Sequence, residues 1–331
     1  MKSDGVETLL ITGATGFVGS HVIDVSPSYK FQVRALVRKP ADAERLRAAG
    51  VECVIGSLED AASLRDAVSG TTAVLHLAAA TKARTAGEYQ RANVAGTQAV
   101  IDAMLAAEPR PARLIYLSSL AAVGPPVGGR PVTRDDVPRP LTTYGRTKLA
   151  GEKVCAVAAD RFQVAVLRAP AVYGPRDRDV FEFFRLANRG IVPLPRAATG
   201  RVQMIHVRDL ARSLLLAATS SAARGVYHVA EAQSYGWEEM ARMVGKALGR
   251  RVRVPRIPTP VIVAAATLNE TIFGIMGRST IFNREKADEL TVQGWLCETE
   301  LARRDFGFEA HIPLQEGFNE TANWYKLNGW L

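Results

Sequence analysis

The sequence lacks the cysteine pattern of a disulfide-rich or metal-binding protein. Its three cysteines, Cys53, Cys155 and Cys297, are scattered through 331 residues, and none has a second cysteine or a histidine nearby at metal-site spacing. We therefore expect reduced thiols in the core of a cytoplasmic protein. We also expect no metal site.

A long uninterrupted hydrophobic run is missing as well. The longest apolar stretch covers residues 260–277, and Asn269 and Glu270 interrupt it near the middle. A bilayer span needs roughly 20 mostly apolar residues, so we expect no stable membrane insertion. The stretch is interpreted as a buried or pocket-lining helix, with loose contact to a membrane surface as the alternative. At the N-terminus, Asp4 and Glu7 precede a short apolar run, which predicts a strand and not a signal peptide.

Acidic residues are fewer than basic ones, and the formal net charge is +9. The arginines are spread along the chain and do not form a basic tail. No recognition motif accompanies this charge, so we expect no nucleic-acid partner. A phosphate-rich cofactor, or an acidic or carrier-linked substrate, explains the excess of positive charge equally well.

Short β-rich runs alternate with helical segments in the first half of the chain. The β-rich runs cover residues 8–13, 31–38, 52–56, 72–79, 113–119 and 162–169, and the helical segments between them include 60–70, 87–108 and 143–160. This alternation predicts βαβ units and an α/β fold of the Rossmann type, with a doubly wound parallel sheet covered on both faces. Such a sheet binds ligands at the carboxyl ends of its strands.

The alternation weakens from about residue 176, which suggests a second, smaller lobe. We assign the strand at 226–230, and the strand end plus helix at 205–219, to the main sheet. The Rossmann-type domain would then comprise residues 1–177 and 205–231, and the C-terminal substrate lobe residues 178–204 and 232–331. Because proline disrupts a helix interior, Pro27 predicts that the first helix ends near Val25.

A glycine-rich loop, TGATGFVGSH, follows the first predicted strand and precedes a helix at residues 12–21. Its glycines are Gly13, Gly16 and Gly19. Glycine permits a tight turn and lets backbone N–H groups approach a pyrophosphate at the helix N-terminus. The loop therefore predicts a dinucleotide site.

The GxxGxxG spacing of this loop resembles that of the short-chain dehydrogenase/reductase superfamily. Further segments resemble, in order, the motifs of its extended branch, the NAD-dependent epimerase/dehydratase superfamily. They are HLAA (76–79), NVAGT (93–97), LSS (117–119), YGRTK (144–148), LRAPAVYGP (167–175) and IHVRDLA (205–211). Within that branch the chain looks most like the 3β-hydroxysteroid dehydrogenase and dihydroflavonol reductase group. The resemblance also implies a homodimer formed through the helices at 93–108 and 143–160.

The resemblance implies a set of cofactor contacts. Besides the three glycines, they are Thr15, Phe17, Val18, Leu58, Leu77, Ala78, Ala79, Asn93, Ser118, Tyr144, Lys148, Pro170 and Val172. The family commonly has Asp-Leu after the third strand to hold adenine. Here Ser57 stands in place of the aspartate, and its hydroxyl group would make that contact.

The end of the second strand favours NADP(H) over NAD(H). An acidic residue at this point accepts from the ribose 2′-OH of NAD, whereas arginine accommodates the 2′-phosphate of NADP. Here Arg38 and Lys39 occupy the strand end, and the first acid is Asp42. A phosphate beside a guanidinium group makes strong, often bidentate hydrogen bonds. NAD(H) remains the alternative.

The YGRTK motif implies the reactive centre. By resemblance, Tyr144 donates a proton to a carbonyl oxygen or accepts one from an alcohol. The pKa of free tyrosine is about 10, and Lys148 one helical turn away would favour the phenolate. Ser119 would polarise the substrate oxygen. Asn93 matches an asparagine near the family's active site, with a catalytic or a structural, water-organising role.

Other residues of these motifs receive structural interpretations. His76 and His206 lie in apolar strand-like runs, so we interpret both as core histidines that support the site, and Arg168 as support for the following loop. The C-terminal lobe contains several aromatic residues that suit an apolar or aromatic substrate, although core packing accounts for any one of them equally well. They are Phe181, Phe183, Phe184, Trp237 and Phe273.

The leading hypothesis is an NADP(H)-dependent oxidoreductase that interconverts a ketone and a secondary alcohol on a small, apolar or aromatic molecule. The first alternative is a sugar-nucleotide epimerase or dehydratase that retains NAD, against which Arg38 speaks. Dehydratases also place acidic residues directly after the catalytic Ser or Thr, whereas Leu120 follows Ser119. The second alternative is a non-catalytic NADP sensor, which usually lacks the tyrosine–lysine pair.

Overall fold

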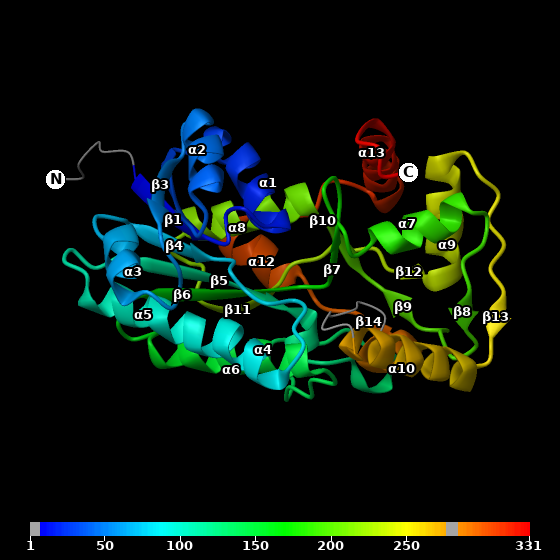
Figure 1. Cartoon of the computed structure of the whole chain (residues 1–331). Helices are drawn as coiled ribbons and strands as arrows, with labels where there is room; N and C mark the ends of the chain where they lie inside the picture. Colours follow the sequence, from blue (N-terminus) through cyan, green and yellow to red (C-terminus); the bar gives the residue numbers. More distant parts are fainter. Residues whose placement is uncertain (1–6, 276–283) are drawn as a thin grey trace.

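A parallel sheet of seven strands forms the larger part of the protein. The computed structural model describes residues 7–275 and 284–331. All the strand pairs of this sheet are parallel, in the order β11-β6-β5-β4-β1-β2-β3 (Figure 1). The strands are β1 (Glu7–Thr12), β2 (Phe31–Val37), β3 (Glu52–Ile55), β4 (Ala73–His76), β5 (Arg113–Ser119), β6 (Gln163–Ala169) and β11 (Gly225–His228).

Helices cover both faces of this sheet (Figure 1). One face carries α1 (Phe17–Val25), α2 (Pro40–Ala48), α8 (Val207–Thr219) and α12 (Glu300–Phe306), and the other carries α3 (Ala61–Val68), α5 (Gly96–Ala106) and α6 (Thr143–Val157). Successive side chains of a strand point to opposite faces. Leu9 and Ile11 accordingly pack in the first core and Leu10 in the second. The predicted α/β fold with a doubly wound parallel sheet is confirmed.

Two expectations about element ends have different outcomes. Helix α1 ends at Val25, and Pro27 lies in the short 3-10 turn that follows, as predicted. Of the segment 205–219, the helix packs on the main sheet as expected, but the assignment of its strand end to that sheet is wrong. Residues Met204–His206 form β10, which pairs with β7 (Ala171–Tyr173) in a separate two-stranded sheet. The edge of the main sheet beside β6 is already occupied by β11, so β10 has no place there.

A second group of elements surrounds an aromatic core. Its helices are α7 (Phe181–Asn188), α9 (Trp237–Leu248) and α13 (Leu314–Leu327), and its short strands are β8 (Leu194–Pro195), β9 (Arg201–Val202), β12 (Tyr235–Gly236), β13 (Arg256–Ile257) and β14 (Gly294–Trp295). Phe184 is buried in this aromatic core, and Phe181, Phe183 and Trp237 pack against the core, so core packing accounts for these four residues. The side chain of Phe273 lies outside the described residues. The division into two domains stays a prediction, and α12 packs on the main sheet although it falls in the predicted lobe.

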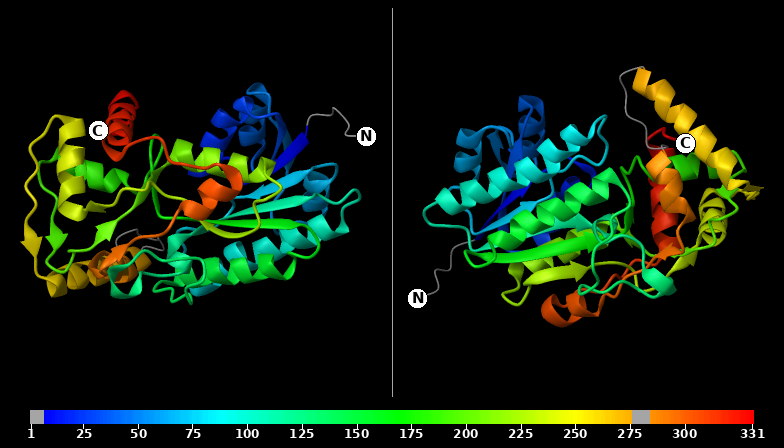
Figure 2. Two further views of the ribbon diagram at one scale, coloured as in Figure 1. Left: turned by 180° about the vertical axis from the view of Figure 1, so that it is seen from behind. Right: turned by 90° about the horizontal axis from the view of Figure 1, so that it is seen from below.

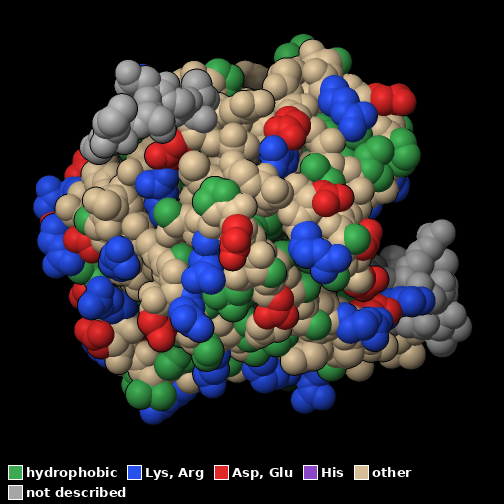
Figure 3. Space-filling view, turned by 90° about the vertical axis from the view of Figure 1, so that its left-hand side faces the viewer, with side chains coloured by type: hydrophobic (Ala, Val, Ile, Leu, Met, Phe, Trp, Pro, Cys, Tyr) green, Lys and Arg blue, Asp and Glu red, His purple; other side chains and the backbone are tan. Residues whose placement is uncertain are grey.

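Helices α10 (Thr259–Ile275) and α11 (Arg284–Thr291) pack against each other at the margin of this second group (Figure 2). Residues 276 and 277 of the apolar stretch lie outside the described part of the chain. Among the described helices, none combines the length and the apolar character needed to cross a bilayer. On the face shown in Figure 3, Lys and Arg side chains are scattered, with Asp and Glu side chains between them.

Candidate active site

The glycine loop lies where the sequence predicts, between β1 and α1 at the carboxyl edge of the sheet. Gly13 has a φ of 77°, and a Cβ atom there would lie 2.7 Å from the backbone nitrogen of Ala78. A Cβ atom on Gly19 would lie 2.2 Å from the carbonyl oxygen of Gly13. No side chain caps α1 at Gly16, which leaves the first-turn N–H groups to an external acceptor. These features fit the pyrophosphate of a dinucleotide.

Replacing Gly13 by alanine is expected to weaken cofactor binding. The new Cβ atom would both strain the left-handed backbone and collide with the end of β4 at Ala78. Strain of this kind costs about 1–3 kcal/mol. Gly50→Ala is the matched control, because Gly50 has a φ of 81° and nothing within 4 Å of its Cβ position. Fluorescence titration with NADPH measures the difference, and equal affinities for both variants would contradict this account of the loop.

Arg38 and Lys39 follow β2 and are both exposed. Thr12 pairs with Leu36, so Arg38 emerges beside the glycine loop. Neither cation takes part in any ion pair within the described part of the chain, whereas Asp42 pairs with Arg45. Two unpaired positive charges thus stand next to the predicted dinucleotide site.

The residues predicted to contact adenine lie in the loop after β3. The Ser57 hydroxyl oxygen accepts from the backbone N–H of Glu59 at 3.3 Å, and its own proton remains available for a ligand. The side chain of Leu58 packs so closely on α5 that a Cβ atom at Gly96 would lie 2.8 Å from it. Leu77, Ala78 and Ala79 follow β4, which neighbours β1 on the side away from β2 and β3, so the glycine loop stands between them and this loop in the strand order.

The side-chain amide of Asn93 makes its hydrogen bonds within the protein. It is buried in a π-helical turn, Arg91–Ala95, between α4 (Ala86–Gln90) and α5. Its Oδ1 accepts from the backbone N–H of Ala80 at 2.7 Å, and its Nδ2 donates to the oxygen of Ala80 at 3.1 Å and to Thr147 Oγ1 at 3.0 Å. Asn93 therefore joins the loop after β4 to α6. This favours its structural role.

His76 belongs to a buried chain of hydrogen bonds. The Thr97 hydroxyl donates to the oxygen of Asn93, so it accepts from His76 Nε2 at 3.0 Å. His76 Nδ1 in turn accepts from the Thr12 hydroxyl at 2.7 Å. Burial, and secondarily the charge of Lys148, lowers the pKa of His76 to about 3. Burial also lowers the pKa of His206 to about 3. Both histidines are thus neutral and internal, as the sequence suggested.

Tyr144, Lys148 and Ser119 come together at the carboxyl edge. Helix α6 runs antiparallel to the strands, so its first turn, with Tyr144, lies near the end of β5, with Ser119. Gly145 makes this approach possible, because a Cβ atom there would lie 2.3 Å from the oxygen of Ala121. Gly145 was not among the predicted site residues, although its place inside the YGRTK motif was a signal.

Burial controls the titration of the pair. It raises the pKa of Tyr144 to about 12, and the Ser119 hydroxyl acts in the opposite direction. It lowers the pKa of Lys148 to about 8, and the Lys148 Nζ lies 4.0 Å from the centroid of the Tyr116 ring. Contrary to expectation, the chain by itself therefore raises the pKa of Tyr144 and does not lower it.

Ser118 points away from Tyr144. Its hydroxyl donates to Glu152 of α6, which also forms a buried ion pair with Arg168 of β6 at 2.7 Å. Only the backbone of Ser118 remains for the predicted cofactor contact. Arg168 supports the neighbouring strands and helix in this way, which agrees with the structural interpretation of that residue.

The PAVYGP segment is attached to α1, the helix that follows the glycine loop. Pro170 directly follows β6 and Val172 lies in β7. His21 of α1 contacts the oxygen of Pro175 through Nε2 at 2.8 Å. Arg176, with a φ of 73°, pairs with Asp24 of the same helix. These contacts hold the segment against the glycine-loop helix, and the cofactor contacts of Pro170 and Val172 stay a prediction.

Two further residues adjoin Tyr144 and were not predicted. The ring of Tyr89, from α4, lies 6.3 Å from that of Tyr144 between centroids. Glu285, from α11, accepts from the backbone N–H and the hydroxyl of Thr143, each at 2.8 Å. No motif of the sequence marks either residue, because the contacts join segments far apart in the chain.

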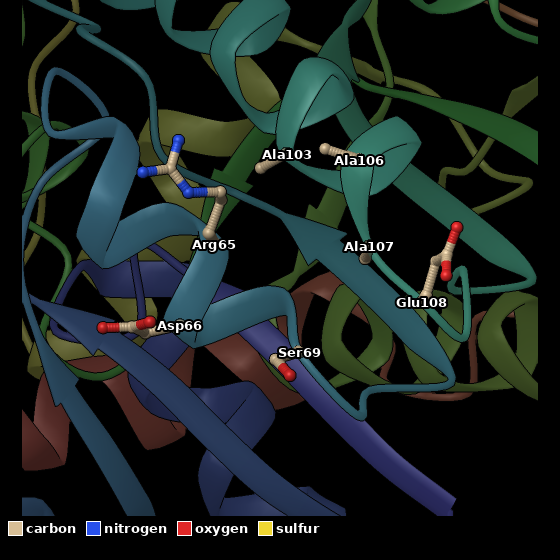
Figure 4. Close-up of a pocket in the computed structure, with 7 residues that line it drawn as sticks. All are labelled: Arg65, Asp66, Ser69, Ala103, Ala106, Ala107 and Glu108. Atoms are coloured by element: carbon tan, nitrogen blue, oxygen red, sulfur yellow. The ribbon is translucent and has the colours of Figure 1, made fainter.

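A pocket of about 230 Å³ lies elsewhere, at the C-terminal ends of α3 and α5 (Figure 4). It is lined by Arg65, Asp66, Ser69, Ala103, Ala106, Ala107 and Glu108. Because these helices run antiparallel to the strands, their C-terminal ends lie at the amino edge of the sheet. The pocket is thus remote from Tyr144.

Known proteins share this arrangement. Residues 9–230 match the NAD dependent epimerase/dehydratase family. The chain is 32% identical over 333 residues to a ceramide reductase of Caulobacter vibrioides, a match covering 100% of this chain and 98% of the relative. It is 27% identical over 326 residues to 4-hydroxy-2-methyl-3-oxo-4-farnesyl-3,4-dihydroquinoline-1-oxide ketoreductase of Stigmatella aurantiaca, with 93% and 94% covered.

A solved structure is also similar. MoeE5 in complex with UDP-glucose and NAD superposes with a TM-score of 0.76 at 27% sequence identity, covering 97% of this chain and 99% of the other. Reductases and a protein that holds a nucleotide sugar thus resemble this chain over nearly its whole length.

Proposed function

The chain belongs to the NAD dependent epimerase/dehydratase family, an enzyme family that acts on CH–OH groups with a nicotinamide cofactor, and on this premise we propose that it is an NADP(H)-dependent ketoreductase for an apolar substrate. The observation that carries the proposal is the pair of unpaired cations, Arg38 and Lys39, beside the glycine loop. A 2′-phosphate would neutralise this charge, whereas the 2′-hydroxyl group of NAD would not.

The reactive groups fit reduction of a carbonyl group. The bound cofactor supplies the hydride to the carbonyl carbon. Tyr144 would transfer its phenolic proton to the carbonyl oxygen as negative charge develops there. The Ser119 hydroxyl would donate a hydrogen bond to the same oxygen. Lys148, buried one helical turn after Tyr144, would supply a positive charge that favours the resulting phenolate.

The apolar class of substrate is supported by the relatives. The names of two of them specify a ceramide and a farnesyl-bearing quinoline, which are long apolar molecules. MoeE5, by contrast, holds UDP-glucose with NAD, so a sugar-nucleotide epimerase is the competing candidate. A non-catalytic sensor is disfavoured, because the carboxyl edge of the sheet carries Ser119, Tyr144 and Lys148.

Replacing Arg38 by alanine is expected to weaken NADPH binding roughly 10- to 150-fold and to leave NADH binding nearly unchanged, because one charge-assisted hydrogen-bonding group to the 2′-phosphate is lost. Fluorescence titration of the reduced nicotinamide measures both affinities. Arg45→Ala, on the next helix, is the control, since Arg45 already pairs with Asp42.

The same protein should consume NADPH in the presence of a long-chain ketone and leave UDP-glucose unchanged. Tightly retained NAD, indifference to NADPH and interconversion of UDP-glucose would contradict the proposal and establish the epimerase in its place.

A further inference from the structure

Helix α10 turns an apolar stripe toward solvent. The exposed residues Val261, Ala264, Ala265 and Leu268 recur at intervals of three and four, which is one face of a helix. Val261 is 55% exposed and Leu268 63% exposed. In an ordinary helix of a globular protein such a stripe faces the core. Here α10 packs against α11 and leaves the stripe uncovered at the margin of the molecule (Figure 2).

Arginines line the chain that leads into this helix. Residues 189–196 lie beside residues 250–257, joined by backbone hydrogen bonds such as Val192 to Arg253 at 2.9 Å and Arg196 to Ile257 at 2.8 Å. Five arginines of these two segments are exposed and form no ion pair with any described residue. They are Arg189, Arg196, Arg250, Arg251 and Arg253.

The two segments themselves add no negative charge. Neither 189–200 nor 249–268 contains aspartate or glutamate. The sixth arginine of the region, Arg256, pairs with Glu238 at 3.2 Å. The end of the smaller group of elements thus combines an exposed apolar stripe with five arginines that form no ion pair with a described residue. We call the stripe and these five arginines the α10 surface.

We propose that the α10 surface docks on a bilayer that contains anionic lipids. Apolar side chains of a surface helix enter the boundary between headgroups and acyl chains, and basic residues next to them attract anionic headgroups. A second copy of the chain fits this surface less well, because its arginines would meet arginines of like charge. The docking would present the active site to a ketone dissolved in the membrane, and that consequence rests on the proposed function.

The test is cosedimentation of the full chain with two kinds of vesicles. We expect binding to vesicles of equal parts phosphatidylcholine and phosphatidylglycerol, and at least tenfold weaker binding to phosphatidylcholine alone. Val261→Glu with Leu268→Glu should weaken binding to the anionic vesicles at least tenfold. Arg250→Gln with Arg251→Gln and Arg253→Gln should do the same, and high salt should mimic this second change.

Val137→Glu with Leu327→Glu is the matched control. These residues are also exposed, at 75% and 87%, but belong to the loop before α6 and to the last position of α13 and not to α10. Unchanged binding of the two α10-surface variants, or equal loss in the control, would overturn the proposal. Concentration-dependent dimerisation that the Val261 and Leu268 changes abolish, without vesicle binding, would identify a second copy as the occupant and also overturn it. Because cosedimentation measures vesicle binding and not turnover, a negative result would not contradict the proposed ketoreductase activity.

Discussion

Tyr144→Phe is expected to lower kcat by about 10²- to 10⁴-fold, the usual contribution of a positioned proton donor. The substitution removes only the hydroxyl group, so the ring contact with Tyr89 and the packing of the first turn of α6 persist. NADPH affinity should change little. Steady-state turnover of a ketone, together with nicotinamide fluorescence, separates the two quantities.

Tyr89→Phe provides the matched control for Tyr144→Phe. Its hydroxyl donates to the oxygen of Thr81 at 3.3 Å, so its loss affects the loop and not the proton transfer. The control should retain most of the kcat. An equal decline in both variants, or a Tyr144→Phe protein with full turnover, would show that another group supplies the proton.

Arg168→Met is expected to reduce the free energy of unfolding by about 3–5 kcal/mol, because it leaves the Glu152 carboxylate buried without its partner. The side chains of Arg168 and Glu152 are only 4% and 6% exposed. Urea denaturation followed by circular dichroism measures the change. The loss should extend to α6, since Glu152 and Ser118 connect that helix to β5 and β6.

Replacing both partners, Arg168→Met with Glu152→Met, should recover much of this loss, because no charge is then buried. Arg303→Met offers the comparison at an exposed pair, Arg303–Glu300, and should leave the free energy of unfolding nearly unchanged. If the double variant were as unstable as the single one, packing and not charge would explain the effect.

The sequence was sufficient for the sheet because each parallel strand is a distinct apolar run bounded by loops. The motifs likewise placed Gly13, Ser119, Tyr144 and Lys148 at one edge, since their spacing places them directly after strands or in the first turn of a helix. The placement of β10 was not predictable in this way. Its residues have strand character, but the choice of partner depended on β11 having already taken the edge beside β6.

The electrostatics of the site could not be predicted from the sequence either. The motif indicates a lysine near a tyrosine, but not that Lys148 is buried over the Tyr116 ring with a pKa near 8. Glu285 contacts Thr143 at the start of α6, a residue 142 positions earlier in the chain. No local sequence pattern indicates a contact of this kind. Burial and long-range contact are tertiary properties.

The π-helical turn at Arg91–Ala95 amounts to one additional residue within an otherwise continuous helix from Ala86 to Ala106. Each residue of an α-helix advances the side chains by about 100° around the axis. Without the additional residue, α4 would be rotated by that angle relative to α5, and Tyr89 would turn away from Tyr144. One additional residue in this helix is thus sufficient to turn the Tyr89 side chain toward Tyr144 without disturbing the sheet beneath it.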